Sequence, residues 1–134
     1  MFLSYLFDSS SLVYALKLKR IGVLAENYIQ ELTIYEVSNA LWKETYVLRK
    51  MSRKEAESLL DVFIQLLSYL KILDLRGLES EVFKIAVETG LNVYDASYLA
   101  LARREKLTLV TEDVKLRNVA STMIQAVSLD ELPA

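Results

Sequence analysis

Apolar residues along this chain occur in two patterns, short continuous runs and longer stretches with helical spacing. The short runs predict strands at residues 2–7, 28–32, 71–75, 107–110 and 124–127, of which the second is the weakest. Helical spacing predicts helices at residues 9–16, 34–49, 52–70, 78–89 and 94–106, and a short one from about residue 112. Strands that alternate with helices predict an α/β fold, in which a parallel sheet of about five short strands is covered by helices on both faces.

Local signals mark where some of these helices begin and end. Ser52 and Glu55 form a capping-box pattern at the start of the helix over residues 52–70. Gly90 predicts the end of the helix over residues 78–89, because glycine readily adopts the left-handed conformation common at helix C-termini. The helices over residues 34–70 offer more apolar surface than one core needs, including Trp42 and Tyr46. We therefore expect this pair to contact a protein partner.

Length and composition limit the possible chemistry. The 134 residues are expected to form one domain, over residues 1–134. The chain has neither Cys nor His, which excludes disulfides, thiolate nucleophiles, Cys/His zinc sites and Ser-His-Asp relays. Any catalysis must use carboxylates, hydroxyls, amines or a hard cation. The net charge of −2 is unlike that of a protein that coats nucleic acid, and no segment is typical of a signal peptide or membrane span, so we expect a cytoplasmic protein.

Four acidic residues are predicted to meet at one edge of the sheet. Asp8 directly follows the first strand, and Asp113 comes just after the strand over residues 107–110. Glu36 and Asp95 lie in the predicted first turns of their helices, and helices of such a fold begin at this same edge. The four carboxylates are therefore expected to converge although they are far apart in the sequence.

Helix capping is the alternative role for each acid, because acidic side chains favour helix N-termini. Asp95 is an N-cap candidate, Thr33 with Glu36 matches a capping box, and Asp113 can stabilise a turn. Hydroxyl residues beside three of the acids can supply cap oxygens instead, namely Ser9, Ser10, Thr33 and Thr111. We therefore expect Asp8, Glu36 and Asp113 to have no capping role, whereas Asp95 has no such substitute.

A tight cluster of carboxylates stays ionised only around a cation. Two carboxylates about 4 Å apart repel by about 4 kcal/mol at an effective dielectric constant of about 20. Oxygen ligands favour hard cations, so the expected ion is Mg²⁺ or Mn²⁺. Such an ion can generate hydroxide from bound water and neutralise charge on a phosphate, two tasks that would otherwise suit His and Lys.

The four acids lie in the segments FDSSSL at residues 7–12, LTIYEVSNAL at 32–41, YDASYLALA at 94–102 and LVTEDVKL at 109–116. In order and spacing, these segments resemble the four acidic motifs of PIN-domain nucleases, especially the small VapC-type toxin ribonucleases. The resemblance covers nearly the whole chain. It implies a single PIN-like domain and a divalent-metal-dependent endoribonuclease that leaves a 5′-phosphate. It also implies homodimers, which we expect to form through the helices over residues 34–70, and inhibition by a cognate antitoxin protein along the active-site groove.

The same resemblance assigns roles to individual residues. It implies four metal-binding and catalytic carboxylates, which are Asp8, Glu36, Asp95 and Asp113. It also implies three supporting polar residues, Ser10, Asn39 and Thr111. Our hypothesis is that the first three acids hold one ion and that the fourth completes this site or places a second ion. Glu112 is a surface residue or a back-up ligand.

Contacts with the RNA substrate are less marked in the sequence. Lys43 lies seven residues after Glu36, near the same helical face, and can contact an RNA phosphate, although a solvated lysine is the simpler interpretation. Arg103, Arg104 and Lys106 form a basic group at a predicted helix C-terminus, where they complement the helix dipole.

Two other functions compete with the nuclease interpretation. A phosphoacceptor signalling domain also places acids beside Mg²⁺ at strand ends, but Asp74 lies within the predicted strand over residues 71–75 and no strand is followed by the lysine that such a site uses. A catalytically idle interaction module would use the surplus apolar surface over residues 34–70. The presence of all four acids argues against it.

Overall fold

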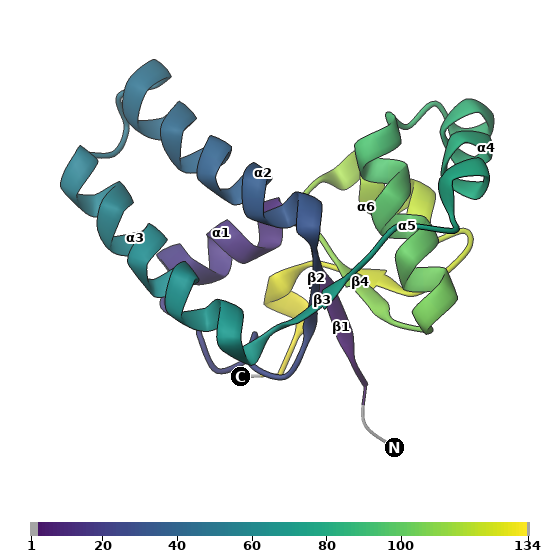
Figure 1. The fold of residues 1–134 in the computed structure, drawn as a ribbon, viewed down its shortest axis with the longest axis horizontal. Helices are drawn as coiled ribbons and strands as arrows, with labels where there is room; N and C mark the ends of the chain where they lie inside the picture. The colour runs from purple at the N-terminus through teal and green to yellow at the C-terminus, as the bar shows by residue number, and fades with distance from the viewer. Residues whose placement is uncertain (1–2, 134) are drawn as a thin grey trace.

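A computed structural model describes residues 3–133 and contains one sheet of five parallel strands. The strands are β1 (Tyr5–Phe7), β2 (Tyr28–Gln30), β3 (Lys71–Leu73), β4 (Thr108–Val110) and β5 (Ala126–Val127). Their order in the sheet is β3-β2-β1-β4-β5, so the chain first builds one half of the sheet and then the other (Figure 1). Because all pairs are parallel, the carboxyl ends of the strands share one edge.

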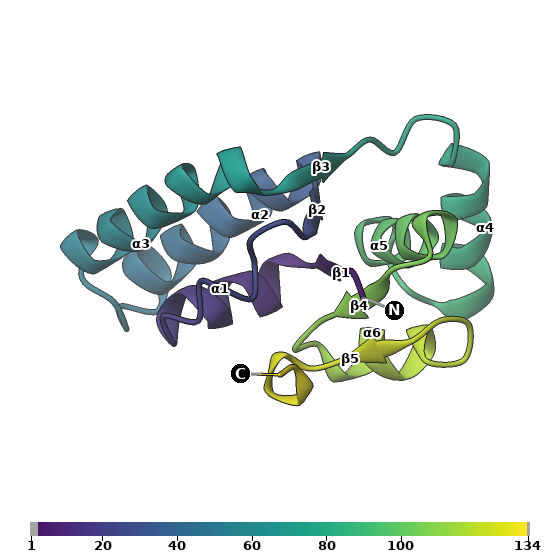
Figure 2. The same ribbon diagram turned by 90° about the horizontal axis from the view of Figure 1, so that it is seen from below.

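Within residues 3–133, six α-helices cover the sheet on both faces, as predicted. One face carries α1 (Ser9–Lys17), α2 (Glu31–Trp42) and α3 (Arg53–Leu66), and the other carries α4 (Glu79–Thr89), α5 (Val93–Glu105) and α6 (Val114–Ala120). Figure 2 shows these two groups on opposite sides of the strands. The chain also contains short helical turns. These are the π-helical η1 (Lys43–Val47) and the 3-10 turns η2 (Leu67–Tyr69) and η3 (Leu129–Glu131).

Each face of the sheet has its own apolar core. Adjacent residues of β1 point to opposite faces, as in any strand, so Phe7 packs with α1, α2 and α3, whereas Leu6 packs with α4, α5 and α6. Both side chains are fully buried. A continuously apolar central strand is typical of a parallel sheet that is covered on both faces.

The beginning of α2 is the main difference from the prediction. The helix begins at Glu31, three residues earlier than Ile34, and its N-cap is Gln30, whose backbone N–H donates to the Thr33 hydroxyl at 3.2 Å. Glu36 therefore lies in the second turn of the helix rather than in the first as predicted, and the alternative Thr33–Glu36 capping box is not formed. At its other end, α2 passes into η1, where the N–H of Leu48 donates to the Lys43 carbonyl in the wider π pattern.

Other boundaries differ from the prediction by a few residues at most. The strand predicted from Phe2 begins at Tyr5, and Phe2 itself lies outside the described residues. The predicted capping box at Ser52 and the left-handed C-cap at Gly90 are both present. The final turn of the predicted helix over residues 52–70 is η2. Within residues 3–133, no helix is both long and apolar enough to span a membrane.

Candidate active site

Asp8 is held by a dense set of hydrogen bonds where β1 ends. The residue is only 5% exposed and is the N-cap of α1, because its Oδ1 accepts the backbone N–H of Ser11 at 2.9 Å. The Ser10 hydroxyl donates to the same oxygen at 2.8 Å, and the Thr111 hydroxyl donates to Oδ2. Sequence reasoning missed Ser11, whose Oγ lies 3.0 Å from Oδ1. Asp8 therefore has the capping role that we expected the neighbouring serines to take.

The hydroxyls around Asp8 also connect the ends of β1 and β4. Ser11 Oγ lies 2.7 Å from the carbonyl oxygen of Val110, and Ser10 Oγ accepts the backbone N–H of Glu112 at 3.0 Å. Thr111 Oγ1 accepts the N–H of Asp113 at 3.1 Å. Ser10 and Thr111, both predicted as supporting residues, thus contact Asp8 from two different strand ends.

Glu36 is positioned by a chain of hydrogen bonds that sequence reasoning missed. The hydroxyl of Tyr98 donates to Glu36 Oε1 at 2.6 Å, and its oxygen lies 2.7 Å from the Thr33 hydroxyl. Because the single Tyr98 proton goes to the carboxylate, Thr33 is the donor in the second contact. The N–H of Gln30 in turn donates to Thr33, so the three bonds point the same way toward Glu36. The available sequence signal was the position of Tyr98 within the small, apolar run at residues 96–102, because a tyrosine that is buried there requires a partner for its hydroxyl.

Asp95 lies in the first turn of α5, but it is not the N-cap. The cap is Asn92, whose Oδ1 accepts the backbone N–H of Asp95 at 2.8 Å. The predicted first-turn position of Asp95 is confirmed, the alternative N-cap role is not, and its half-buried carboxylate is left for another task. Ser97, two residues later, accepts a bond from the Gln30 side chain at 2.8 Å and so joins α5 to the start of α2.

Asp113 and Glu112 both have local structural roles. Asp113 is exposed and is the N-cap of α6, because its Oδ1 accepts the N–H of Leu116 at 3.1 Å. Our expectation that Asp113 has no capping role is wrong. Glu112 Oε2 accepts the N–H of Leu129 at 2.8 Å and thereby holds the start of η3. This contact gives the Glu112 carboxylate a task other than that of a free surface residue or a back-up ligand.

The four predicted acids, which we call the acidic edge, influence one another electrostatically. Burial is the main cause that raises the pKa of Asp8, Glu36 and Asp95 above the ordinary carboxyl value. The charges of Asp8 and Asp95 further raise the pKa of Glu36, and those of Asp113 and Asp8 further raise the pKa of Asp95. Lys115 partly opposes the effect on Asp95. Repulsion of this kind disfavours three neighbouring anions unless a cation joins them.

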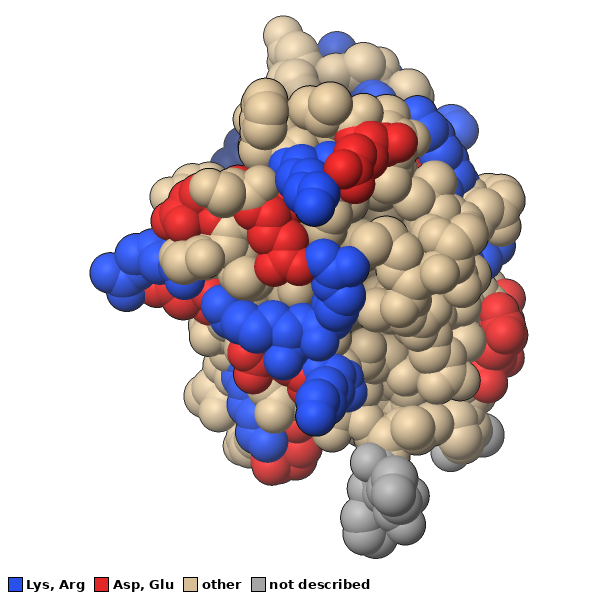
Figure 3. Space-filling view, turned by 90° about the vertical axis from the view of Figure 1, so that its right-hand side faces the viewer, with Lys and Arg blue, Asp and Glu red and all other residues tan. Residues whose placement is uncertain are grey.

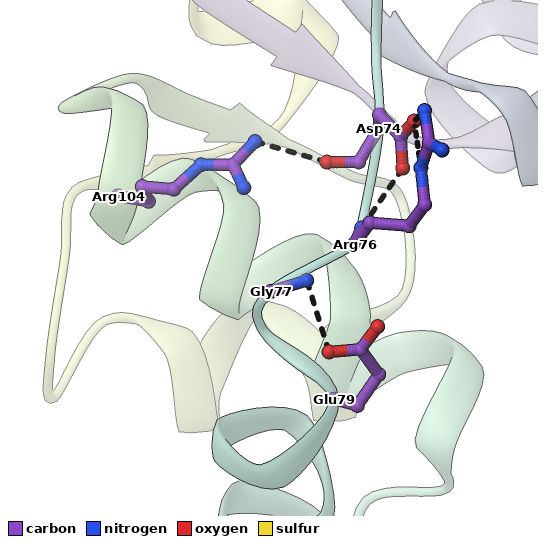
Figure 4. Close-up of polar contacts among 5 residues, drawn as sticks. All are labelled: Asp74, Arg76, Gly77, Glu79 and Arg104. Atoms are coloured by element: carbon purple, nitrogen blue, oxygen red, sulfur yellow. Dashed lines mark hydrogen bonds and ion pairs between the residues drawn. The ribbon is translucent and has the colours of Figure 1, made fainter.

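Asp74 shows how an acid at the same sheet edge behaves when it is paired. It follows β3 rather than lying within it as predicted, and its Oδ2 contacts the Arg76 guanidinium at 2.6 Å (Figure 4). Arg104 Nη2 donates to its carbonyl oxygen at 3.0 Å, which ties the loop to α5. Hydrogen bonds from Arg76 lower the pKa of Asp74, whereas the pKa values of Asp8, Glu36 and Asp95 are raised.

The donor set of the acidic edge suits a hard divalent cation, although the side chains are not arranged around one in advance. Its donors are carboxylate oxygens, and a cation would relieve the repulsion that raises their pKa values. Over residues 3–133, no three acidic side chains lie close enough together to form a ready metal site. Glu36 and Asp95 would therefore have to turn toward Asp8 before one ion contacts all three.

Two further predicted residues lie along α2 and η1. Asn39 is exposed, one turn after Glu36, and Lys43 is exposed at the first position of η1. Both lie on the helix that runs away from the acidic edge. They follow Glu36 along α2 and η1, but among the described residues neither side chain forms a hydrogen bond with the network around Asp8.

Comparisons with known proteins give one family profile and two close relatives. The profile described as PIN domain matches residues 2–121. Exonuclease VapC9 from Pyrobaculum aerophilum is 41% identical over 115 residues, which cover 84% of this chain and 82% of that protein. Ribonuclease VapC3 from the same organism is 34% identical over 92 residues, which cover 68% of this chain and 69% of that protein.

Solved structures show the same fold. The crystal structure of PAE2754 from Pyrobaculum aerophilum matches with a TM-score of 0.78 and 33% identity, covering 96% of this chain and 90% of that one. A chain in the structure of VapBC2 from Rickettsia felis, bound to a DNA fragment from their promoter, matches with a TM-score of 0.60 and 23% identity. That match covers 94% of this chain and 98% of the other, and at this identity it shows the fold alone.

Proposed function

The chain belongs to the PIN-domain family, and from this premise we propose that it is a divalent-metal-dependent endoribonuclease and the toxin of a toxin–antitoxin pair. The observation that carries the proposal is the acidic edge, where Asp8, Glu36 and Asp95 are buried or half-buried and the charge of Asp8 adds to the burial that raises the pKa values of Glu36 and Asp95. The names of the two relatives, an exonuclease and a ribonuclease, support a nuclease.

In this proposal Asp8, Glu36 and Asp95 hold one Mg²⁺ or Mn²⁺ ion, and Asp113 completes the site or helps to place a second ion. When bound, such an ion would supply hydroxide from water at neutral pH and would neutralise charge that develops on the scissile phosphate. The protein contributes orientation. Ser10 and Thr111 hold the Asp8 carboxylate, and the hydroxyl of Tyr98 holds that of Glu36, as outer-shell partners commonly do around metal ligands.

Asn39 and Lys43 are proposed to face the RNA rather than the ion. Both are exposed on the segment that leads away from Glu36. A lysine there can contact a phosphate as a compact point charge, and an asparagine can donate to a phosphate oxygen or a ribose hydroxyl.

Cleavage of the RNA chain at internal positions is the part of the proposal that the names of the relatives leave open, since one of them is called an exonuclease. A circular single-stranded RNA has no end for an exonuclease to attack. We expect the protein to linearise this circular RNA when Mn²⁺ is present and to leave it intact when chelator is present. Degradation of the linear form alone would replace the endonuclease assignment with an exonuclease.

The proposed protein partners are a cognate antitoxin and a second copy of the chain. Two-component assemblies such as VapBC2 support the first, and two exposed apolar residues outside the Trp42–Tyr46 pair, Tyr35 on α2 and Ile64 on α3, support both. We propose that the homodimer forms through the helices over residues 34–70 and that the antitoxin binds across the acidic edge. Light scattering after size-exclusion chromatography tests for the dimer. Loss of RNA cleavage when the antitoxin is added tests for the antitoxin partner.

The direct test of the function compares RNA cleavage by wild type with cleavage by Asp95→Asn. This substitution keeps the size of the side chain and leaves the Asn92 cap in place. The matched control is Asp74→Asn, which removes a carboxylate at the same sheet edge that is already paired with Arg76. We expect metal-dependent cleavage by wild type and by Asp74→Asn, and none by Asp95→Asn. Equal cleavage by all three would indicate a contaminating nuclease or an idle interaction module.

A further inference from the structure

The turn that joins α2 to α3 combines positive charge with exposed aromatic rings. Residues 43–54 contain five basic residues and one acidic residue, a net charge of +4 within a chain whose net charge is −2. We call this segment together with the preceding Trp42 the basic tip. Its basic and aromatic members are Trp42, Lys43, Tyr46, Arg49, Lys50, Arg53 and Lys54. It lies at the end of the α2–α3 pair that is farthest from the sheet (Figure 1).

The aromatic rings of the basic tip form a short stacked column. Trp42 and Tyr46 are one turn apart, and their ring centroids are 5.8 Å apart at an interplanar angle of 17°. The guanidinium of Arg49 lies over the Tyr46 ring, 5.8 Å from its centroid. The rings are not protected by the core, since Trp42 is 52% exposed and Tyr46 is 65% exposed. Beside them, between α2 and α3, is a mostly apolar hollow of about 310 Å³.

Most of the charge at the basic tip is free of ion pairs. Among the described residues, Lys43, Arg49, Lys50 and Lys54 form no salt bridge, and Arg53 meets only the exposed Glu57 at 3.6 Å.

Basic residues on the opposite side of the molecule are arranged differently. Figure 3 shows Lys and Arg side chains on the side where α4 lies, with acidic side chains among them. There Arg103 is bonded to Glu81, and Arg104 to Glu105 at 2.6 Å. The basic tip therefore combines several unpaired basic residues with stacked rings, whereas on the α4 side two of the basic residues, Arg103 and Arg104, are paired with acids.

We propose that the basic tip binds single-stranded RNA by stacking a base on the Trp42–Tyr46 column while its lysines and arginines contact the phosphates. This inference rests on the proposed function, for which it supplies a second contact with the substrate. Exposed aromatic rings beside basic side chains are the usual platform for single strands, because every base has a face that can stack. Trp42 lies six residues after Glu36 on the same helix, about 9 Å along its axis, so one strand can reach both regions.

Charge and base stacking together distinguish single-stranded RNA from the other possible occupants of the basic tip. In a two-fold contact centred on the basic tip, the tip of one copy would face the tip of the other, which places positive charge against positive charge. A duplex keeps its bases stacked within the helix and offers none to the column. An acidic protein segment would satisfy the charge without requiring stacked rings, and the experiments below separate it from RNA.

Trp42 is the only tryptophan in the chain, so its fluorescence reports directly on the basic tip. With chelator present to prevent cleavage, titration with a short single-stranded RNA should quench this fluorescence, and added salt should reverse the quenching. The same RNA as a duplex and a poly-glutamate peptide should have much smaller effects. Absence of quenching by the single strand, or equal quenching by the peptide, would overturn the proposal.

Two surface variants test the contacts separately under the same metal-free conditions. Tyr46→Ala removes half of the column, and we expect RNA affinity to fall at least about fivefold, the lower end for loss of one stacking partner. Lys50→Glu reverses a free charge and should weaken binding and lower its salt dependence. The matched control is Lys84→Glu, an equal charge reversal at an exposed position of α4, which should bind like wild type.

Circular dichroism and thermal melting establish that each variant is folded. If the two tip variants and the control all bind RNA like wild type, the proposal is wrong. If all three lose affinity equally, only overall charge matters and the proposal is also wrong. Cleavage of saturating RNA with Mn²⁺ tests the proposed function independently, so a chain that cleaves RNA but shows no effect at the tip keeps that function and loses this inference.

Discussion

The acidic edge and the basic tip lie toward opposite ends of the α2–η1 segment and are built in opposite ways. At the acidic edge, buried hydroxyls hold the carboxylates, with Thr111 donating to Asp8 and Tyr98 donating to Glu36. At the basic tip, the Trp42 and Tyr46 rings are exposed and are held mainly by their mutual stacking. The first region carries like negative charges that repel one another, and the second carries free positive charges.

This difference matches what each proposed task requires. Metal ions and reacting phosphates need ligands fixed to within a fraction of an ångström, which requires outer-shell hydrogen bonds. A sequence-tolerant grip on a single strand needs only accessible rings and cations. The acidic edge should therefore control the rate of chemistry, and the basic tip should control affinity.

The largest expected effect is a separation of rate from affinity. Asp95→Asn should lower the cleavage rate at saturating RNA by more than about 100-fold, beyond the usual loss for an outer-shell partner, and should leave metal-free RNA affinity unchanged. Tyr46→Ala should lower metal-free RNA affinity at least about fivefold and should leave the cleavage rate at saturating RNA unchanged. Single-turnover cleavage and fluorescence titration measure the two quantities. A common loss of both quantities in both variants would show that the two regions act as one site.

Metal binding should stabilise the wild type measurably. At an ion concentration of about 100 times its dissociation constant, one bound ion contributes about 2.7 kcal/mol. For a domain of this size, that corresponds to a rise in Tm of roughly 10 °C. Melting with Mn²⁺ against chelator tests this, and Lys50→Glu serves as the control that should keep the full rise. An unchanged Tm in the wild type would mean that the acidic edge does not hold the ion.

Tyr98→Phe should have a smaller effect that is specific to the acidic edge. The ring still fills its buried space, but Glu36 loses its hydrogen bond and the Thr33 hydroxyl loses its acceptor. We expect Mn²⁺ affinity to fall by about 10-fold or more, as is usual for outer-shell partners. Isothermal titration measures this affinity. A change in Tm without a change in metal affinity would restrict Tyr98 to a structural role.

The pH dependence of stability should distinguish Asp95 from a paired acid. Because the folded state raises the pKa of Asp95, its ionisation destabilises the fold as pH rises from about 4, the ordinary carboxyl value, to above the folded-state value. In chelator, Asp95→Asn should therefore match wild type at low pH and melt a few °C higher at pH 7. Asp74→Asn should differ in the opposite direction, because its folded pKa is lowered. Melting curves recorded from low pH to pH 7 measure how the Tm of each variant differs from that of the wild type.

The smallest effect is expected for a basic residue outside both regions. Arg104→Ala removes one bond to the Asp74 carbonyl and an exposed pair with Glu105. Such surface contacts contribute about 0–1 kcal/mol. Tm should fall slightly, while cleavage rate and RNA affinity should both match wild type. A clear loss of RNA affinity would extend the binding surface to the α4 side.

Most of the fold could be predicted because its signals are local. The apolar runs at β1 and β4 and the helical spacing of α3 and α5 identify each element without knowledge of its neighbours. The start of α2 could not be predicted in this way. Its N-cap is Gln30, a residue type that rarely serves as one, and the Gln30 side chain is held by Ser97 from another helix.

The candidate site was predicted in part for the same reason. Asp8 comes directly after a strand and Asp113 lies just beyond another, and parallel strands end at a common edge, so their position follows from the order of elements. The division of labour among the acids was predicted wrongly. Asp8 and Asp113 cap helices themselves, and Asp95 does not, because Asn92 takes that role.

The sequence by itself determined which elements form, in what order, and which side chains can hold a hard cation, because hydrophobic spacing and residue chemistry are local properties. The tertiary structure decided which hydroxyl meets which carboxylate. Tyr98 reaches Glu36 across 62 residues of sequence and Thr111 reaches Asp8 across 103, contacts that exist only after α5 and β4 are packed beside α2 and β1. It also decided which acids are paired and which are left to repel one another, since a pairing energy depends on distance and burial.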